Sequence, residues 1–139
     1  FVSGFISQKA ADVTLPAMKD YLARAVGKSD EEWKKLYEEI RVELAKKMPK
    51  VTVAAVADHI EYIRKHAGVD HIGIGSDFDG NDNWPEGLSD VSMFPNLFAE
   101  LVRRGWSDED LAKIAGGNVL RALEQAEAVA KRLQSEKPN

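Results

Sequence analysis

The chain has 139 residues, of which 44% are hydrophobic and 30% charged, with a formal net charge of -4 and no cysteine. This length and apolar content suffice for one hydrophobic core, so a single globular unit is expected. The composition excludes several classes, because no apolar run approaches the roughly 20 residues that span a bilayer, no basic face suits nucleic acid, and no disulfide or thiolate metal site can form. The lack of cysteine leaves localisation open. The chain begins at Phe1 without an initiating Met or a basic secretory region, so we expect a piece of a longer protein.

A strand end and a helix are the first predicted elements. Phe1 to Ser7 alternate bulky and small side chains, which is typical of the end of a strand. Apolar residues then recur among good helix formers from Asp12 to Val26. We expect a helix in the second half of that range, after Pro16, with Gly27 as its stop.

A strong helix start follows at Ser29. Ser29 and Glu32 form a capping box, in which each side chain accepts a hydrogen bond from a backbone amide at the helix start. The next apolar residues recur every three or four positions and predict one buried stripe on an otherwise charged outer helix. They are Trp33, Leu36, Tyr37, Ile40 and Leu44.

The middle of the chain predicts a helix followed directly by a strand. Thr52 to His66 carries an apolar stripe and is ended by Gly68. The run from Val69 to Gly80 begins as an apolar strand and ends in a small-residue turn that carries Asp77 and Asp79. A strand, a long helical excursion, a second strand and further helices are typical of parallel α/β structure.

Asp77 is the first candidate functional residue. In parallel α/β proteins the carboxyl ends of strands face the crevice in which sites are assembled. The Asp-x-Asp-Gly pattern is equally common turn chemistry, and the spacing does not separate these two interpretations. A calcium loop is disfavoured, because the helix-loop-helix calcium motif requires Gly at its sixth position and Glu at its twelfth, where this chain has Asp82 and Leu88.

The histidines and the loop after the turn give weaker signals. His59, His66 and His71 form no metal-binding pair and are interpreted as structural or surface residues. Asn81 to Leu88 predicts an irregular loop. Its Trp84 either covers a binding site or packs against its own domain, and the sequence leaves both open.

Helices are expected throughout the rest of the chain. An apolar stripe runs from Met93 to Val102, and Ser107 caps a short helix that ends at Gly116-Gly117-Asn118. The last helix should run from Val119 to Leu133, and residues 134–139 should form a frayed polar tail. Its inward side chains should be Leu120, Leu123, Ala126 and Val129.

Two strands alone make no stable parallel sheet, so the rest of the sheet is expected outside this chain. Three segments resemble the C-terminal part of the membrane dipeptidase (renal dipeptidase) family, the M19 peptidases of the amidohydrolase superfamily. The first runs from Asp58 to Gly80, and Gly73 to Gly80 is its most specific piece. The others are Pro85 to Ser92 with Phe94, Pro95 and Leu97, and Leu111 to Leu123 with Gly117-Asn118-Val119-Leu120-Arg121.

The resemblance implies an α/β fold, the C-terminal part of a (β/α)8 TIM-type barrel, predominantly helical within this chain. Residues 1–139 would then be one portion of a single metallo-dipeptidase barrel domain, with roughly six βα units upstream. It further implies that the complete protein hydrolyses dipeptides with two zinc ions. The family's zinc ligands lie on earlier strands, and none has a matching position here.

The same resemblance places the family's catalytic acid at Asp77, where it would transfer protons between the attacking water and the leaving amine. Asp79 either supports the groups that form the site or caps the loop, and we favour the cap. The implied partners are a dipeptide substrate and the upstream N-terminal portion of the barrel, and a homodimer stays open. The isolated fragment is expected to be inactive. The alternative is a non-catalytic helical interaction module whose Asp-rich turn is structural.

Overall fold

The computed structural model describes residues 1–136, whose regular structure is almost entirely helical. The long helices are α2 (Gln8–Ala25), α3 (Asp30–Lys47), α4 (Val53–Ala67), α5 (Phe94–Arg103) and α7 (Asn118–Ser135). The short helical segments are α1 (Ser3–Ile6), η1 (Val69–His71), η2 (Val91–Met93), α6 (Asp108–Ala112) and η3 (Lys113–Gly117). Within residues 1–136, no helix combines the length and the apolar character needed to cross a membrane.

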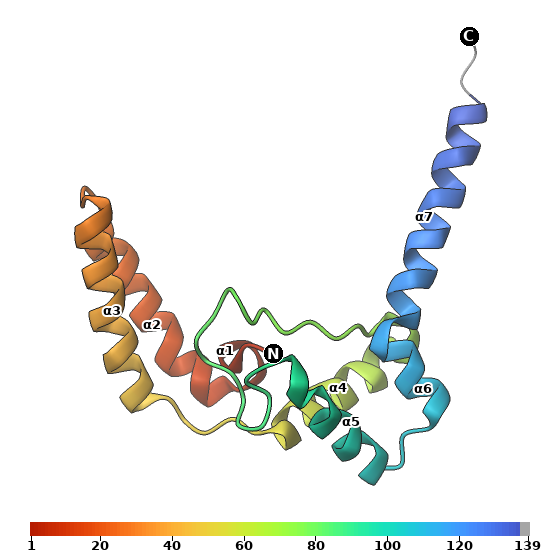
Figure 1. Ribbon diagram of the computed structural model, residues 1–139, viewed down its shortest axis with the longest axis horizontal. Coiled ribbons are helices and arrows are strands. Elements are labelled where there is room, and N and C mark those ends of the chain that lie inside the picture. The colour runs from red at the N-terminus through yellow and green to blue at the C-terminus, as the bar shows by residue number, and fades with distance from the viewer. Residues whose placement is uncertain (137–139) are drawn as a thin grey trace.

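The helices form an open arrangement rather than a closed bundle (Figure 1). Helices α4 and α5 lie together at the base, the α2–α3 pair rises on one side, and α7 projects on the other. Residues 72–76, which follow η1 and are called the extended segment below, run in an extended path from the α7 side toward the α2–α3 pair (Figure 1). The extended segment therefore runs between the α7 side of the molecule and the side of the α2–α3 pair.

The main core lies where α4 packs against α5. It is apolar and also draws residues from the extended segment, from the loop before α5 and from the helices after it. Its members are Val56, Ala57, Ile60, Ile72, Leu88, Leu97, Leu101, Trp106 and Ile114. Outside the core, the Arg104 guanidinium joins the end of α5 to α4, because it donates to Asp58 and Glu61 at 2.7 Å each. This core carries the start of the extended segment through Ile72.

Local signals placed several helix ends correctly. The Ser29 capping box is present, with the Ser29 amide donating to Glu32 Oε2 at 2.9 Å. Gly68 ends α4 with φ 88°, a left-handed conformation that glycine adopts without a steric penalty. A smaller core joins α2 to α3 through Tyr21, Ala25 and Leu36.

Helix α2 corrects the prediction that a helix begins only after Pro16. It starts at Gln8 and runs through Pro16, which lies inside it. A proline removes one backbone hydrogen bond from a helix interior, and the packing of α2 against α1 and α3 compensates for that loss.

The two predicted strands are absent from the described residues, and this is the main correction. Ser3–Ile6 forms α1 instead of a strand end, and Val69–His71 is a 3-10 turn. Residues 72–76 are outside any helix or strand, although Ile72 has strand-like angles of φ -107° and ψ 134°. Ladder hydrogen bonds need a neighbouring strand, and residues 1–136 provide no such neighbour for this segment.

Helix α7 corrects a second expectation. Leu120 and Leu123, predicted to face inward, are 61% and 55% exposed, and Val129 is 46% exposed. Ala126 is exposed as well. No other described helix packs along its length, as its projection in Figure 1 shows. Residues 134 and 135 belong to α7, and the part of the predicted tail at 137–139 lies outside the described residues.

Candidate functional site

Asp77 lies at the end of the extended segment in an uncommon backbone conformation. Its φ is 55°, which no other non-glycine residue of the described chain shares in sign. Asp and Asn tolerate this left-handed conformation better than other side chains. The Asp77 carbonyl accepts hydrogen bonds from the Gly80 amide at 3.1 Å and from Asn81 Nδ2 at 2.7 Å. The turn is therefore built around the backbone of the candidate catalytic residue.

The Asp77 carboxylate lies directly over Gly80. A Cβ atom at Gly80 would stand 2.1 Å from Asp77 Oδ1 and 2.9 Å from its Cγ. Only a residue without a side chain permits that approach. Asp77 is exposed in this structure, so its carboxylate is accessible from solvent.

The loop after the turn is tied to other elements at several points, among them the Gly87 carbonyl, which accepts from Asn96 Nδ2 of α5 at 2.9 Å. The Asn83 carbonyl accepts from the Ser3 amide of α1 at 3.1 Å, and the Glu86 amide donates to the Val51 carbonyl at 2.7 Å. Asp82 accepts a hydrogen bond from the Tyr37 hydroxyl of α3 at 3.1 Å. The loop is irregular, as the sequence predicts, yet it is held on both sides.

Trp84 packs within this loop. Its side chain is partly buried, and its indole N–H is buried without a hydrogen-bond partner in residues 1–136. A partly buried ring with a buried indole N–H favours packing against its own domain over a role as a mobile cover. A half-buried aromatic cluster lies next to Asp77, where the Phe78 ring stands 6.3 Å from Phe1 and 5.8 Å from Phe94 between centroids.

The amino group of Phe1 lies beside the end of the extended segment. It donates to the Gly75 carbonyl at 2.7 Å and to the Ser76 carbonyl at 3.1 Å. The N-terminal segment thus borders the candidate site, which its sequence alone does not indicate.

The described residues of this chain do not form a zinc site by themselves. Within residues 1–136, no group of three or more His, Asp or Glu side chains is arranged to hold a metal ion. Of the histidines, His66 contacts the Tyr62 carbonyl through Nδ1 at 2.8 Å, while His59 and His71 are exposed. Asp79 makes no side-chain hydrogen bond within the described range, so its predicted capping role stays a prediction.

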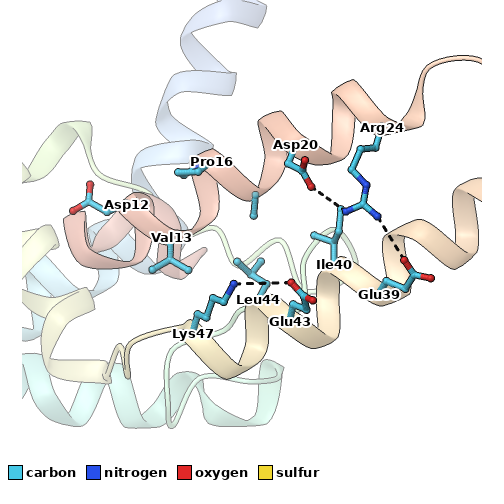
Figure 2. A pocket seen from close by; sticks show the side chains of 11 residues that line it. Asp12, Val13, Pro16, Asp20, Arg24, Glu39, Ile40, Glu43, Leu44 and Lys47 are labelled. Atoms are coloured by element: carbon cyan, nitrogen blue, oxygen red, sulfur yellow. Dashed lines mark hydrogen bonds and ion pairs between the residues drawn. The ribbon is translucent and has the colours of Figure 1, made fainter.

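A hollow of about 490 Å³ lies between α2 and α3, and its walls come only from these helices. Figure 2 shows apolar side chains such as Val13 and Leu44 between the two helices, together with charged pairs. These pairs include Arg24 with Glu39 at 3.6 Å. Neither Asp77 nor the loop after it lines this hollow, so the candidate site does not coincide with it.

Comparison with known proteins identifies relatives of the chain. Residues 2–137 match the family described as Membrane dipeptidase (Peptidase family M19). Dipeptidase ataJ from Aspergillus terreus is 55% identical over 85 residues, which cover 61% of this chain and 21% of that protein. Dipeptidase 3 from Homo sapiens is 43% identical over 86 residues, covering 62% of this chain and 18% of that protein.

A solved structure agrees with these sequence relatives. The crystal structure of the probable dipeptidase PvdM from Pseudomonas aeruginosa is similar with a TM-score of 0.57 and 36% identity. The similarity covers 70% of this chain and 24% of that one. The chain matches only about a fifth of the length of these curated relatives.

Proposed function

Because the chain belongs to the membrane dipeptidase family, peptidase family M19, we propose that it is the C-terminal part of a protein that hydrolyses dipeptides. The names of its relatives support the class of reaction. The proposal concerns the complete protein, since matching relatives extend well beyond the region that this chain covers.

The proposed fold of the complete protein is a (β/α)8 barrel whose upstream units cover the open surfaces of this chain. The extended segment after Ile72 carries backbone groups without ladder partners, and such an edge readily pairs with a neighbouring strand. The burial of its residues alternates, with Ile72 buried against the helices and Gly73 and Gly75 exposed, as in a strand between a helical layer and a barrel interior. The exposed apolar residues of α7, including Leu120 and Leu123, would be covered in the same assembly.

Asp77 is the proposed proton carrier. Its exposed carboxylate stands at the end of the extended segment, where barrel enzymes assemble their sites. It would accept a proton from the attacking water and return it to the leaving amine. The two zinc ions of the proposed enzyme would be held upstream of this chain, because its own described residues offer no ligand cluster. The observation that carries the proposal is the turn that holds Asp77 over Gly80.

The test is Asp77→Asn in the complete protein, with Asp79→Asn as the matched control. Asparagine keeps the size of the side chain and tolerates positive φ, so the turn should persist. We expect kcat for a simple dipeptide to fall by about 10²–10⁴-fold in Asp77→Asn, the usual size of a general acid-base contribution. Asp79→Asn should stay close to the unmodified protein. Unchanged turnover in Asp77→Asn would refute the assignment.

The isolated chain gives a second test, which asks whether the metal ligands lie upstream of this chain. Purified residues 1–139 with added zinc should not cleave dipeptides, because the chain lacks the metal ligands. Cleavage by the isolated chain would contradict the proposal that those ligands lie upstream.

A non-catalytic interaction module is the second candidate, and a specific surface favours it. Helix α2 exposes an apolar row in addition to the face that packs on α3. The row consists of Leu15, Met18 and Leu22, and the exposed Val26 directly after the helix continues it. A complete protein that neither cleaves dipeptides nor changes in any assay with Asp77→Asn would support this candidate.

A further inference from the structure

We propose that α3 is a positioning element for Asp77, acting through Asp82 in the loop that follows the turn. Tyr37 and Arg41 of α3 hold the Asp82 carboxylate, and the adjacent Asn81 binds the Asp77 backbone. The inference rests on the proposed role of Asp77 as a proton carrier and adds residues that lie far from it in sequence.

Two side chains of α3 converge on Asp82. The Tyr37 hydroxyl donates to Asp82 Oδ2 at 3.1 Å, and Arg41 Nη1 lies 3.7 Å from the same oxygen. Both side chains come from one face of the helix, since they are four residues apart. Asp82 is therefore the link between the α2–α3 pair and the loop.

The side chains of Tyr37 and Arg41 are each oriented by a neighbouring residue. The Tyr37 ring packs edge-on against Tyr21 with centroids 6.0 Å apart. Arg41 makes two further hydrogen bonds to Glu38, at 2.7 and 2.9 Å. These contacts restrict the side-chain rotamers before Asp82 is bound, so α3 presents to the loop a preformed hydroxyl donor and a preformed positive charge.

The link continues from Asp82 to Asp77 within five residues. Asn81 donates from Nδ2 to the Asp77 carbonyl at 2.7 Å and accepts from the Asn83 amide at 2.9 Å. The residues on both sides of Asp82 are thus joined to each other and to the backbone of Asp77. A shift of Asp82 would move Asn81 and, with it, the turn that sets the Asp77 carboxylate.

A contact of this kind suits positioning better than folding. The side chains of Asp82 and Arg41 are 38% and 45% exposed, and exposed pairs contribute little to global stability. Catalysis is more sensitive, because a small misplacement of a reacting group lowers the rate of the chemical step. Loss of the link should therefore lower kcat while the protein stays folded.

The experiment uses Tyr37→Phe in the complete protein, with Tyr62→Phe of α4 as the matched control. Tyr62 is exposed, and its ring stacks on His66 rather than reaching the loop. We expect Tyr37→Phe to lower kcat for a dipeptide about three- to tenfold with less than a twofold change in KM, within the range of small geometric errors at reacting groups. Backbone amides of the loop, Gly80 and Asn83 in particular, should exchange hydrogen for deuterium faster.

A double variant shows whether the effect passes through Asp82. Asp82→Ala should lower kcat in the same way, and Tyr37→Phe added to it should have no further effect, because the contact is already lost. Additive losses would overturn the proposed link. Arg41→Lys, which keeps the charge, should retain more activity than Arg41→Ala, and equal losses in both would also count against it.

The outcomes separate this inference from the proposed function. If Asp77→Asn loses activity but Tyr37→Phe behaves like Tyr62→Phe in kcat and in amide exchange, the positioning role of α3 is wrong and the role of Asp77 stands. Full activity of Asp77→Asn would overturn both.

Discussion

Replacing Gly80 with Ala tests whether the Asp77 carboxylate must lie where the structure places it. The added Cβ would stand 2.1 Å from Asp77 Oδ1, whereas ordinary contacts of such an atom begin at 3.4 Å, so the oxygen must move by about 1.3 Å. The carboxylate is exposed and can rotate, so the conflict is relieved by moving the side chain rather than by unfolding. Gly80 is not among the residues with positive φ, and alanine fits its backbone.

The expected loss follows from that displacement. A 1 Å error at a reacting group costs on the order of 100-fold in rate, which corresponds to about 2.7 kcal/mol in the activation free energy of the proposed hydrolysis. The free energy of unfolding should change by less than about 1 kcal/mol, as for other Gly to Ala replacements at compatible angles. Steady-state kinetics on a dipeptide and urea unfolding of the complete protein measure the two quantities.

A double variant gives the decisive comparison. If Gly80→Ala acts only by moving the Asp77 carboxylate, it should have no further effect in an Asp77→Asn background. Wild-type kcat in Gly80→Ala, or an equal loss in both backgrounds, would refute the reasoning.

Two further predictions concern stability. Hydrogen bonds, first from Arg103 and second from Arg104 in size of effect, hold the pKa of Glu100 at about 2, below its ordinary value of 4.5. The contribution of ionised Glu100 to the free energy of unfolding is therefore complete above pH 4.5 and is lost as the pH falls toward 2. Urea unfolding at a series of pH values should show this loss. Glu100→Gln should make the free energy of unfolding depend less steeply on pH between about 2 and 4.5, and an unchanged dependence would contradict the lowered pKa of Glu100. Asn118 Nδ2 donates to the carbonyls of Val69 and Ile72 at 2.8 Å each, so Asn118→Asp should lower the free energy of unfolding by about 2 kcal/mol because carboxylate then faces carbonyl. Asn118→Ala should cost less, and the reverse order would show that the amide is not the anchor of the extended segment.

Local sequence signals predicted the helices well and the strands poorly, for a physical reason. A capping box such as Ser29 with Glu32 satisfies helix-end amides within four residues, so its signal is complete in the sequence. A strand is satisfied only by a neighbour, and the run after Ile72 has the composition of a strand without that neighbour. The apolar stripe of α7 likewise predicts a face to be covered but does not identify what covers it.

The candidate site was likewise only partly predictable from the sequence. Asp77 was predicted from its place after an apolar run and from a family resemblance, and the structure places it in a turn with its carboxylate over Gly80. The contact of Tyr37 with Asp82 joins residues 45 positions apart, and neither residue carries a local signal for the other. The edge-to-face contact of the Phe1 and Phe94 rings likewise has no local signal in the sequence.

The left-handed backbone of Asp77 also restricts which substitutions evolution or a library can explore at that position. Outside Gly, Asn and Asp, an L-residue held at φ 55° incurs a steric cost of about 1–2 kcal/mol before any chemistry is considered. A saturation library at position 77 sorted only for folded protein should therefore enrich those three residues and deplete β-branched ones. Sorted for turnover, the same library should retain Asp alone, and the gap between the two profiles would measure selection for the carboxylate separately from selection for the turn.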